Sequence, residues 1–301
     1  MNSSAYKTIA GMSGVEILTN KSLKSYTGFA TGGDADYIAI PQSLQAFIDA
    51  VNTLRKHGER FFILGNGSNV LALDEGYRGW IVLTKKALGG VAFNSDSTVE
   101  AGAGVNMSSF CMQCAERGLS GLEFAYGIPG SVGGAVFMDA GAYGGEIKDV
   151  LESATVLDEH GNVLRLENKE LEFGYRTSAI QSGGYIVIGA RFKLAKSNRA
   201  EITARMHDFM QQREDKQPLD YPSCGSTFKR PVNGYASKLI DDCGLRGKTI
   251  GGAAVSDKHC GFVVNKSGAT SSDVLELIEY IKQAVKEKTG VTLEKEIRIL
   301  K

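Results

Sequence analysis

The chain has 301 residues, of which 43% are hydrophobic, so it can bury a large core in one lobed domain or in about two domains. Its 34 lysines and arginines balance its 34 aspartates and glutamates, which argues against a general binder of nucleic acids or polyanions. No apolar run approaches the roughly 20 residues of a membrane span, and no basic segment followed by an apolar one opens the chain, so we expect neither a membrane anchor nor a signal peptide. Five cysteines, an odd and sparse set, indicate reduced thiols and a cytoplasmic protein.

Glycine is the unusual component of the sequence. There are 37 glycines but only 5 prolines, whereas a flexible linker would be rich in both. This balance predicts many tight backbone turns inside a folded, enzyme-like body.

Helical spacing of apolar residues, capping residues and short apolar runs predict the elements. Before about residue 22 the pattern is weak. In chain order, the first elements predicted are a helix from Ser43 to Gly58, strands at 61–64, 81–83 and 99–105, and a helix from Asn106 to Gly118. The later ones are a hairpin of 154–157 and 163–166, a strand at 185–194, a helix at 201–213, a loop at 218–231, a helix at 274–285 and a strand at 293–300.

Familiar phosphate-binding and metal-binding motifs are absent from the sequence. The pair Gly65-x-Gly67 lacks the third glycine of a dinucleotide fingerprint, since Val70 stands there. Cys111 and Cys114 have no second cysteine pair and no nearby histidine, so we interpret them as small buried side chains on one helix face. The four histidines are not at ligand spacing, and we expect no metal.

Two glycine-rich loops carry the strongest indication of a ligand. Residues 65–69 (GNGSN) follow a predicted strand and offer successive backbone N–H groups, which suits a pyrophosphate. Residues 127–145 contain seven glycines, which let the backbone lie close to an extended ligand. Together the loops indicate a large phosphate-bearing cofactor. Neither contains His or Cys, which disfavours a covalent flavin.

Two further polar clusters lie in the last third of the chain. Residues 221–231 place hydroxyls, a thiol and two cations in a loop with proline near both ends. In the predicted last strand, alternation places Ile297 and Ile299 on one face and Glu294, Glu296 and Arg298 on the other.

At these places the sequence resembles the UDP-N-acetylenolpyruvoylglucosamine reductases, the MurB flavoenzymes of bacterial peptidoglycan synthesis. The matching segments run in the family's order over nearly the whole chain: 65–69, 127–135, 141–144, 173–178, 224–231 and 293–298. Six segments in register make the resemblance highly specific. The chain is similar to the family's short form, without an additional tyrosine-bearing loop.

The resemblance implies an α+β fold. It comprises an FAD-binding half of the vanillyl-alcohol-oxidase/PCMH type, made of two subdomains, and a C-terminal α+β substrate-binding subdomain. The implied boundaries are 1–84, 85–196 and 197–301. It also implies non-covalent FAD, with NADPH as co-substrate. The residues implied to bind FAD are Gly65, Asn66, Gly67, Ser68, Asn69, Gly127, Ile128, Pro129, Gly130, Ser131, Gly133, Gly134, Gly141 and Ala142.

The resemblance further implies reduction of the enolpyruvyl ether of UDP-N-acetylglucosamine-enolpyruvate to UDP-N-acetylmuramate. Hydride passes from flavin N5 to C3, and Ser226 gives a proton to C2. Arg176 and Glu296 flank the substrate carboxylate. A carboxyl beside a developing negative charge helps only when it carries a proton, so Glu296 is expected to donate a hydrogen bond. The implied UDP-sugar contacts are Tyr175, Lys229, Arg230 and His259.

Two alternatives stay open on the sequence. Another FAD-dependent oxidoreductase of the same fold would not need Ser226 and Glu296. A nucleotide-binding module without activity would bind FAD or UDP without turnover. In either case we expect small-molecule partners, no nucleic acid, no membrane and a monomer.

Overall fold

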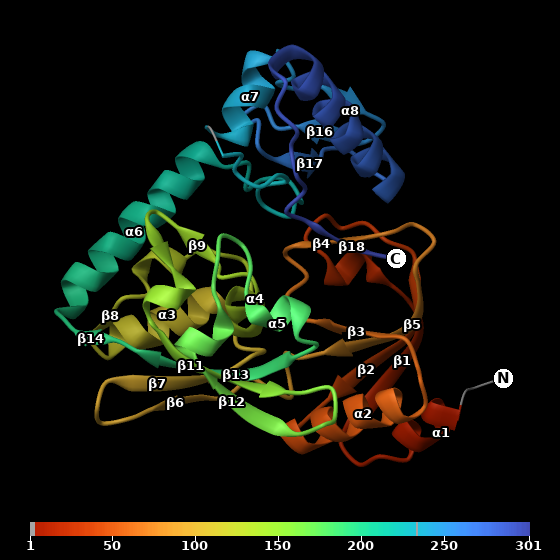
Figure 1. Ribbon diagram of the computed structural model, residues 1–301, viewed down its shortest axis with the longest axis vertical. Helices are drawn as coiled ribbons and strands as arrows, with labels where there is room; N and C mark the ends of the chain where they lie inside the picture. The colour runs from red at the N-terminus through yellow and green to blue at the C-terminus, as the bar shows by residue number, and fades with distance from the viewer. Residues whose placement is uncertain (1–3, 233) are drawn as a thin grey trace. The chain divides into compact units, whose positions relative to one another are not determined.

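The computed structural model describes residues 4–232 and 234–301, which form two compact units that we describe separately (Figure 1). The first unit comprises the chain up to Thr19, Tyr37–Asn66 and Gly79–Gln211. The second comprises Asn20–Asp36, Gly67–Arg78 and Gln212–Lys301. The three subdomains expected from the resemblance remain a prediction.

The helices are α1 (Ser4–Ala10), α2 (Leu44–Lys56), α3 (Met107–Glu116), α4 (Val132–Phe137), α5 (Ala179–Ser182), α6 (Arg199–Lys216), α7 (Ala236–Asp242) and α8 (Ser271–Thr289). Short 3-10 helices lie at Leu23–Tyr26, Glu123–Ala125, Ile147–Asp149 and Asn168–Leu171. The strands are β1 (Val15–Ser22), β2 (Asp34–Pro41), β3 (Phe61–Leu64), β4 (Val70–Ala72), β5 (Tyr77–Leu83), β6 (Val91–Phe93), β7 (Thr98–Gly102), β8 (Leu119–Ser120), β9 (Gly141–Ala142), β10 (Gly145–Glu146), β11 (Leu151–Leu157), β12 (Val163–Glu167), β13 (Ile186–Lys193), β14 (Ala195–Lys196), β15 (Thr249–Ile250), β16 (Ala253–Val255), β17 (Val263–Asn265) and β18 (Arg298–Leu300).

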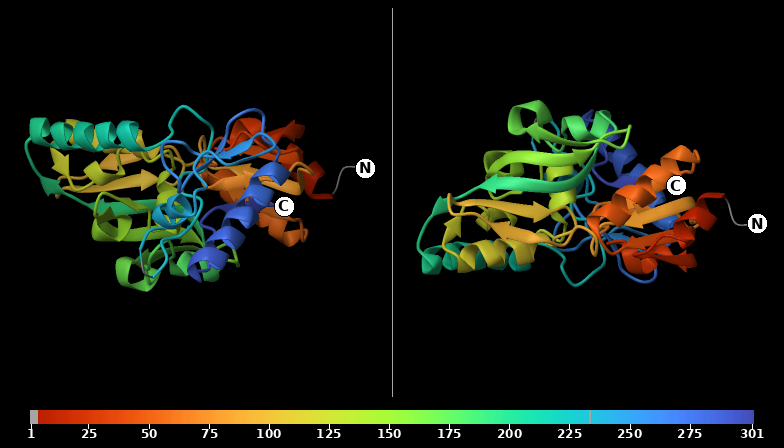
Figure 2. Two further views of the ribbon diagram at one scale, coloured as in Figure 1. Left: turned by 90° about the horizontal axis from the view of Figure 1, so that it is seen from above. Right: turned by 90° about the horizontal axis from the view of Figure 1, so that it is seen from below.

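Antiparallel strands in the order β12-β11-β13-β7-β6 form the largest sheet, which belongs to the first unit. Helix α3 packs on this sheet: the ring centroids of Phe110 on the helix and Phe192 on β13 lie 5.0 Å apart. Cys111 and Cys114 are buried on the same helix, as predicted, and burial raises the pKa of Cys114 to about 12. Figure 2 shows these strands side by side in two further views.

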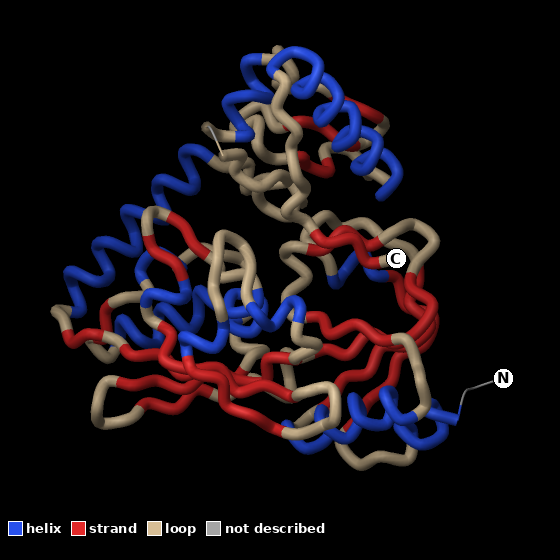
Figure 3. The backbone as a smooth tube through the Cα atoms, viewed as in Figure 1, coloured by secondary structure: helices blue, strands red, loops and turns tan. Residues whose placement is uncertain are grey.

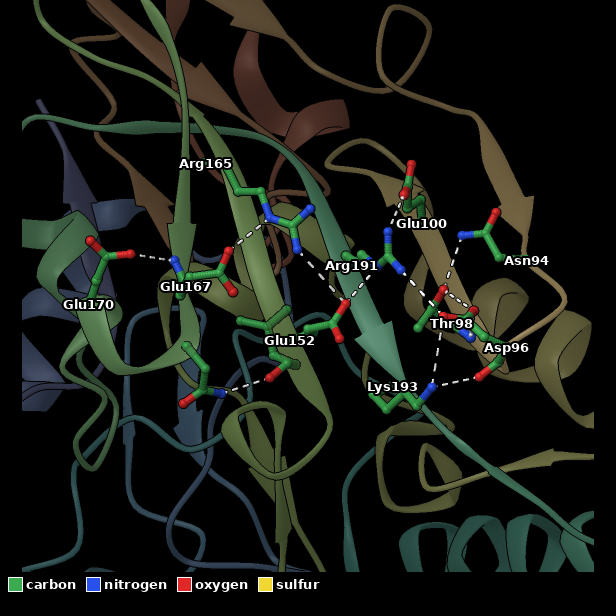
Figure 4. A network of polar contacts seen from close by, with 12 residues as sticks. Asn94, Asp96, Thr98, Glu100, Glu152, Arg165, Glu167, Glu170, Arg191 and Lys193 are labelled. Atoms are coloured by element: carbon green, nitrogen blue, oxygen red, sulfur yellow. Dashed lines mark hydrogen bonds and ion pairs between the residues drawn. The ribbon is translucent and has the colours of Figure 1, made fainter.

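A ladder of ion pairs crosses this sheet (Figure 4). Arg191 on β13 contacts Glu152 on β11 at 2.5 Å and Glu100 on β7 at 3.3 Å. Arg165 on β12 extends the ladder to Glu167 at 3.0 Å. Glu100, Arg165 and Glu167 are about half exposed, so their pairs add little stability. The contacting atoms of Arg191 and Glu152 are buried, and opposite charges face one another across the strands.

A four-stranded sheet has the order β1-β2-β5-β3, and β3 pairs with β5 in parallel. Within the first unit, Trp80 of β5 is fully buried and its ring stacks on Tyr37 at 4.5 Å. Helix α2 begins where Ser43 accepts a hydrogen bond from the N–H of Ala46, and Phe47, Val51 and Leu54 form its buried face. The predicted cap and helix are therefore confirmed.

The second unit has its own apolar core around α8. The buried residues of this helix are Ser271, Val274, Leu277, Ile278, Ile281 and Val285. The helix packs on the small antiparallel sheet β15-β16-β17. Asp74 accepts hydrogen bonds from the N–H groups of Ser271 and Ser272 at 3.0 and 3.2 Å, which supplements the capping box of Thr270 and Asp273. Figure 3 shows the long loop that precedes α7.

Three sequence predictions need correction. The weakly patterned N-terminal region contains α1 and β1. The strand predicted at 99–105 ends at Gly102. The last strand covers only Arg298–Leu300, so the strand predicted from Leu293 is too long: Lys295 forms only an isolated bridge with Phe228. Leu293 and Ile297 are buried and Glu294 is exposed, which agrees with the predicted alternation.

Among the helices that the structure describes, none combines the length and apolar character needed to cross a bilayer.

Candidate active site

The two glycine-rich loops meet in the first unit. The side-chain N–H of Asn66 donates to the carbonyl of Gly130 at 2.9 Å and to that of Pro129 at 3.3 Å. Gly65 also lies close to the second loop, because a Cβ at position 65 would lie 2.4 Å from the hydroxyl oxygen of Ser131. Segments that lie 64 residues apart in sequence therefore form one surface of bare backbone.

Helix α4 and its cap shape the second loop. Ser131 accepts a hydrogen bond from the N–H of Gly134 at 3.3 Å and so begins the helix. Gly133 packs against Ala103, whose Cβ would lie 2.7 Å from a Cβ at position 133. The N–H of Gly127 donates to the hydroxyl of Ser108 at 3.1 Å. The loop predicted at 127–145 thus contains the short helix α4, and its Gly133 serves close packing.

The first glycine loop fits a diphosphate. Gly67 has φ +63°, and a Cβ there would lie 1.9 Å from the carbonyl oxygen of Tyr26, so only glycine is tolerated. Within residues 4–232 and 234–301 we find no protein acceptor for the backbone N–H groups of Asn66, Gly67 and Ser68. Successive unsatisfied N–H groups are what a nucleotide diphosphate requires. The residues present thus fit the FAD that the resemblance implies.

Arg176 reaches this glycine-rich region within the first unit. It lies in a tight turn in which Gly174 and Thr177 exchange two backbone hydrogen bonds, and its own φ is +57°, an uncommon value for a residue with a side chain. Its guanidinium donates to the carbonyls of Asp139 at 3.2 Å and Gly141 at 2.9 Å. The head group is therefore oriented by backbone carbonyls.

Asp139, which sequence reasoning missed, supports that arrangement. It is fully buried, and its carboxylate accepts a hydrogen bond from the N–H of Lys148 at 2.9 Å, with the Lys148 ammonium 3.6 Å away. Burial is the main cause that raises the pKa of Asp139. No sequence motif marks this pair, because the contact depends on the turn between β9 and β10.

Ser226 and Glu296 both belong to the second unit, and Ser226 precedes a residue that is hydrogen-bonded to Glu296. Between them lies Thr227, which is fully buried and whose carbonyl accepts the N–H of Glu296 at 2.9 Å. Asn69 joins from the first glycine loop: its side-chain N–H donates to the carbonyl of Glu296 at 3.3 Å. The parallel pairing of β18 with β4, in which Arg298 faces Val70, sets this register. Ser226 itself is exposed and Glu296 is half-buried.

Two further residues of the loop at 221–231 are placed as follows. Cys224 is buried, its thiol donates to the carbonyl of Val70, and burial raises its pKa to about 12, so it is a thiol at neutral pH. Lys229 contacts Glu294 at 3.5 Å.

Two predicted cations lie beside tyrosine rings. Arg230 lies over the ring of Tyr235 at 4.9 Å, and Arg176 lies over the ring of Tyr175 at 5.0 Å. Tyr175, the predicted substrate contact, has 42% of its surface exposed. A search of the described part of the chain finds no group of three or more histidine, cysteine or acidic side chains suited to a metal.

Comparison with known proteins identifies the class first. The family model of the FAD-binding domain matches residues 35–167, which include both places where the glycine loops meet. The model of the C-terminal domain of UDP-N-acetylenolpyruvoylglucosamine reductase matches residues 217–300, which include Ser226 and Glu296. An FAD-binding oxidoreductase fold joined to this second domain is the α+β architecture that the sequence predicts.

Whole-chain relatives then give the family. A UDP-N-acetylenolpyruvoylglucosamine reductase of Lachnoclostridium phytofermentans is 47% identical over 94% of this chain and 93% of its own length. One of Clostridium botulinum is 48% identical over 94% and 92%. The crystal structure of MurB from Thermus caldophilus superposes with a TM-score of 0.78 at 34% identity, covering 95% of this chain and 99% of that one. The chain belongs to the UDP-N-acetylenolpyruvoylglucosamine reductase family.

Proposed function

We propose that the protein reduces the enolpyruvyl ether of UDP-N-acetylglucosamine-enolpyruvate to UDP-N-acetylmuramate with electrons from NADPH. The observation that carries the proposal is the hydrogen bond between the N–H of Glu296 and the carbonyl of Thr227, which holds Glu296 beside the residue that follows Ser226. Family membership over 94% of the chain supports the same activity. It argues against both alternatives, a different flavin oxidoreductase and a module without activity.

Reduction of the C2=C3 bond adds a hydride at C3 and a proton at C2. FAD, when bound, supplies the two-electron chemistry, and the loops at 65–69 and 127–134, with Gly141 and Ala142, hold it without a covalent bond. The protein must then stabilise negative charge that spreads from C2 into the substrate carboxylate, and must protonate C2.

Arg176 and Glu296 take the first task. The planar guanidinium of Arg176 matches a carboxylate, and the carbonyls of Asp139 and Gly141 orient it. Glu296, half-buried, donates a hydrogen bond from its protonated carboxyl group to the developing charge.

Ser226 takes the second task. A neutral hydroxyl is a weak acid, but the carbanionic carbon that hydride addition creates is basic enough to accept its proton. The buried Thr227 next to it fixes the backbone from which this hydroxyl extends. Lys229 and Arg230 supply positive charge for the diphosphate of the substrate, and Tyr175 supplies an exposed ring for the uridine. His259, which the resemblance groups with them, is considered separately below.

The chemistry of the substrates also bears on partners and location. UDP-sugars and NADPH are charged metabolites of the cytoplasm, so we place the protein there, acting as a monomer on small molecules.

One experiment tests the function. The purified protein should be yellow, NADPH should bleach the flavin, and UDP-N-acetylglucosamine-enolpyruvate should restore the colour without oxygen. A reduced flavin that the enolpyruvyl sugar fails to reoxidise would reject this activity and favour a different flavin oxidoreductase.

A further inference from the structure

His259 lies in a closed turn of the second unit. The N–H of Ser256 donates to the carbonyl of Phe262 at 2.9 Å, and the N–H of Phe262 donates to the carbonyl of His259 at 3.0 Å. The imidazole packs edge-on against the ring of Phe262, with 5.0 Å between centroids. The ring is therefore held in a rigid turn and is half-buried.

One nitrogen of this imidazole already has a fixed partner. The backbone N–H of Gly261 donates to Nδ1 of His259 at 3.1 Å. Because a backbone N–H can only donate, Nδ1 must be unprotonated and the proton of the neutral ring must be on Nε2. A Cβ at position 261 would lie 2.9 Å from the ring's Cε1, so glycine is needed for this contact.

Backbone hydrogen bonds connect Gly261 through Thr227 to the proposed catalytic pair. The carbonyl of Gly261 accepts the N–H of Thr227 at 2.9 Å, and the carbonyl of Thr227 accepts the N–H of Glu296 at 2.9 Å. The hydroxyl of Thr227 also accepts the N–H of Val263 at 3.0 Å. Every polar group of Thr227 is thus bonded, and its position depends on the turn that His259 closes.

We propose that His259 is a positioning residue that acts through Nδ1: it fixes Gly261, which anchors Thr227 between Ser226 and Glu296. This inference rests on the proposed function and replaces the substrate contact expected for His259. A substrate contact would use Nε2, the nitrogen that carries the proton. The two possibilities therefore place the decisive interaction on different atoms of one ring.

A matched pair of variants separates them. The amide oxygen of Asn in His259→Asn occupies nearly the place of Nδ1, whereas the amide of Gln in His259→Gln occupies nearly that of Nε2. Both variants are first checked for bound flavin, thermal midpoint and reduction by NADPH. The rate and the substrate-concentration dependence of flavin reoxidation by UDP-N-acetylglucosamine-enolpyruvate are then measured.

We expect His259→Asn to reoxidise its flavin within about twofold of wild type. His259→Gln should be roughly tenfold slower at saturating substrate with little change in KM, because the half-buried hydrogen bond from Gly261 is lost. The opposite order, a change confined to KM, or equal rates for the two variants would each overturn the inference. If wild type is not reoxidised at all, the proposed function fails instead.

A second measurement does not depend on activity or on stable variants. Hydrogen exchange in the wild-type protein should show protected amides at both Gly261 and Thr227. Exchange of either amide at the rate of an open loop would overturn the proposal, because the hydrogen-bond path from His259 would then be broken.

Discussion

Asn69 forms hydrogen bonds with the backbone on both sides of Ile297: its side chain donates to the carbonyl of Glu296 at 3.3 Å, and its own carbonyl accepts the N–H of Arg298 at 3.0 Å. The end of the first glycine loop is thereby tied to the segment that carries a proposed catalytic carboxyl.

Asn69→Ala should slow substrate reoxidation of the flavin about fivefold, since the lost bond contributes about 1 kcal/mol. Asn69→Asp, which lacks the donor and adds a negative charge beside the carbonyl oxygen of Glu296, should be slowed further. Rates normalised to bound flavin check this, and a wild-type rate in either variant would contradict it.

Ser226→Ala should separate the two half-reactions. The hydroxyl acts only after hydride transfer, so reduction of the flavin by NADPH should keep its wild-type rate. Reoxidation by substrate should fall about 100-fold or more, as expected for removal of a positioned acid. Rapid-mixing absorbance measurements of each half-reaction decide the matter. Equal slowing of both would make Ser226 a structural residue.

Two substitutions of Glu296 should differ. An amide N–H can partly replace a protonated carboxyl as hydrogen-bond donor, so Glu296→Gln should retain more activity than Glu296→Ala. Single-turnover reoxidation measured for both variants tests this. Equal and complete loss would assign proton delivery to Glu296, and wild-type rates in both would remove it from the mechanism.

The flavin should leave the denatured protein. Neither glycine loop offers a His or Cys for covalent attachment. Precipitation with acid should therefore release FAD into the supernatant, where its absorbance measures it. Colour that stays with the precipitate would contradict this expectation.

Asp74→Ala should weaken the start of α8. Burial alone would raise the pKa of Asp74, but the hydrogen bonds from Ser271 and Ser272 outweigh it and hold the pKa below the ordinary 3.8. We expect a loss of about 1 kcal/mol in the free energy of unfolding at pH 7, as for other helix caps.

The pH dependence of this loss follows from the lowered pKa. The contribution of Asp74 is fully present above its ordinary pKa and is lost as pH falls through the lowered one, so the difference from wild type should shrink at pH 3. Urea unfolding at both pH values measures it. Glu75→Ala, a neighbouring exposed carboxylate, is the control, and an equal loss there would contradict the assignment to the cap.

Local signals made much of the fold predictable. Ser43 and Asn106 cap the helices that the sequence assigns to them, because a cap needs only residues within one turn. The glycine loops were found because their composition is a local property. Helix α1 was missed since its buried face consists only of Ala5 and Ile9.

Non-local pairing set the limit of prediction. The pairing of the chain end is fixed by β4 and by the backbone bridge between Phe228 and Lys295, so the sequence predicted a strand that begins five residues before the observed one at Arg298. Thr227 lies within the matching segment 224–231 but was not singled out there, and Asp139 lies in no matching segment. Their importance comes from partners at distant positions, Glu296 and Gly261 for Thr227 and Arg176 for Asp139, and a single sequence does not reveal such partners.

The left-handed backbone of Arg176 has a consequence for protein engineering. At φ +57°, any residue with a side chain costs about 1 kcal/mol or more relative to glycine. Glycine at this position would relieve that strain but would also lose the hydrogen bonds to the carbonyls of Asp139 and Gly141, which contribute about 1 kcal/mol each or more. The contacts of the arginine side chain therefore compensate for the strained backbone. A substitution of Arg176 by glycine is expected to lower heat resistance as well as to remove the cation that the proposed reaction uses.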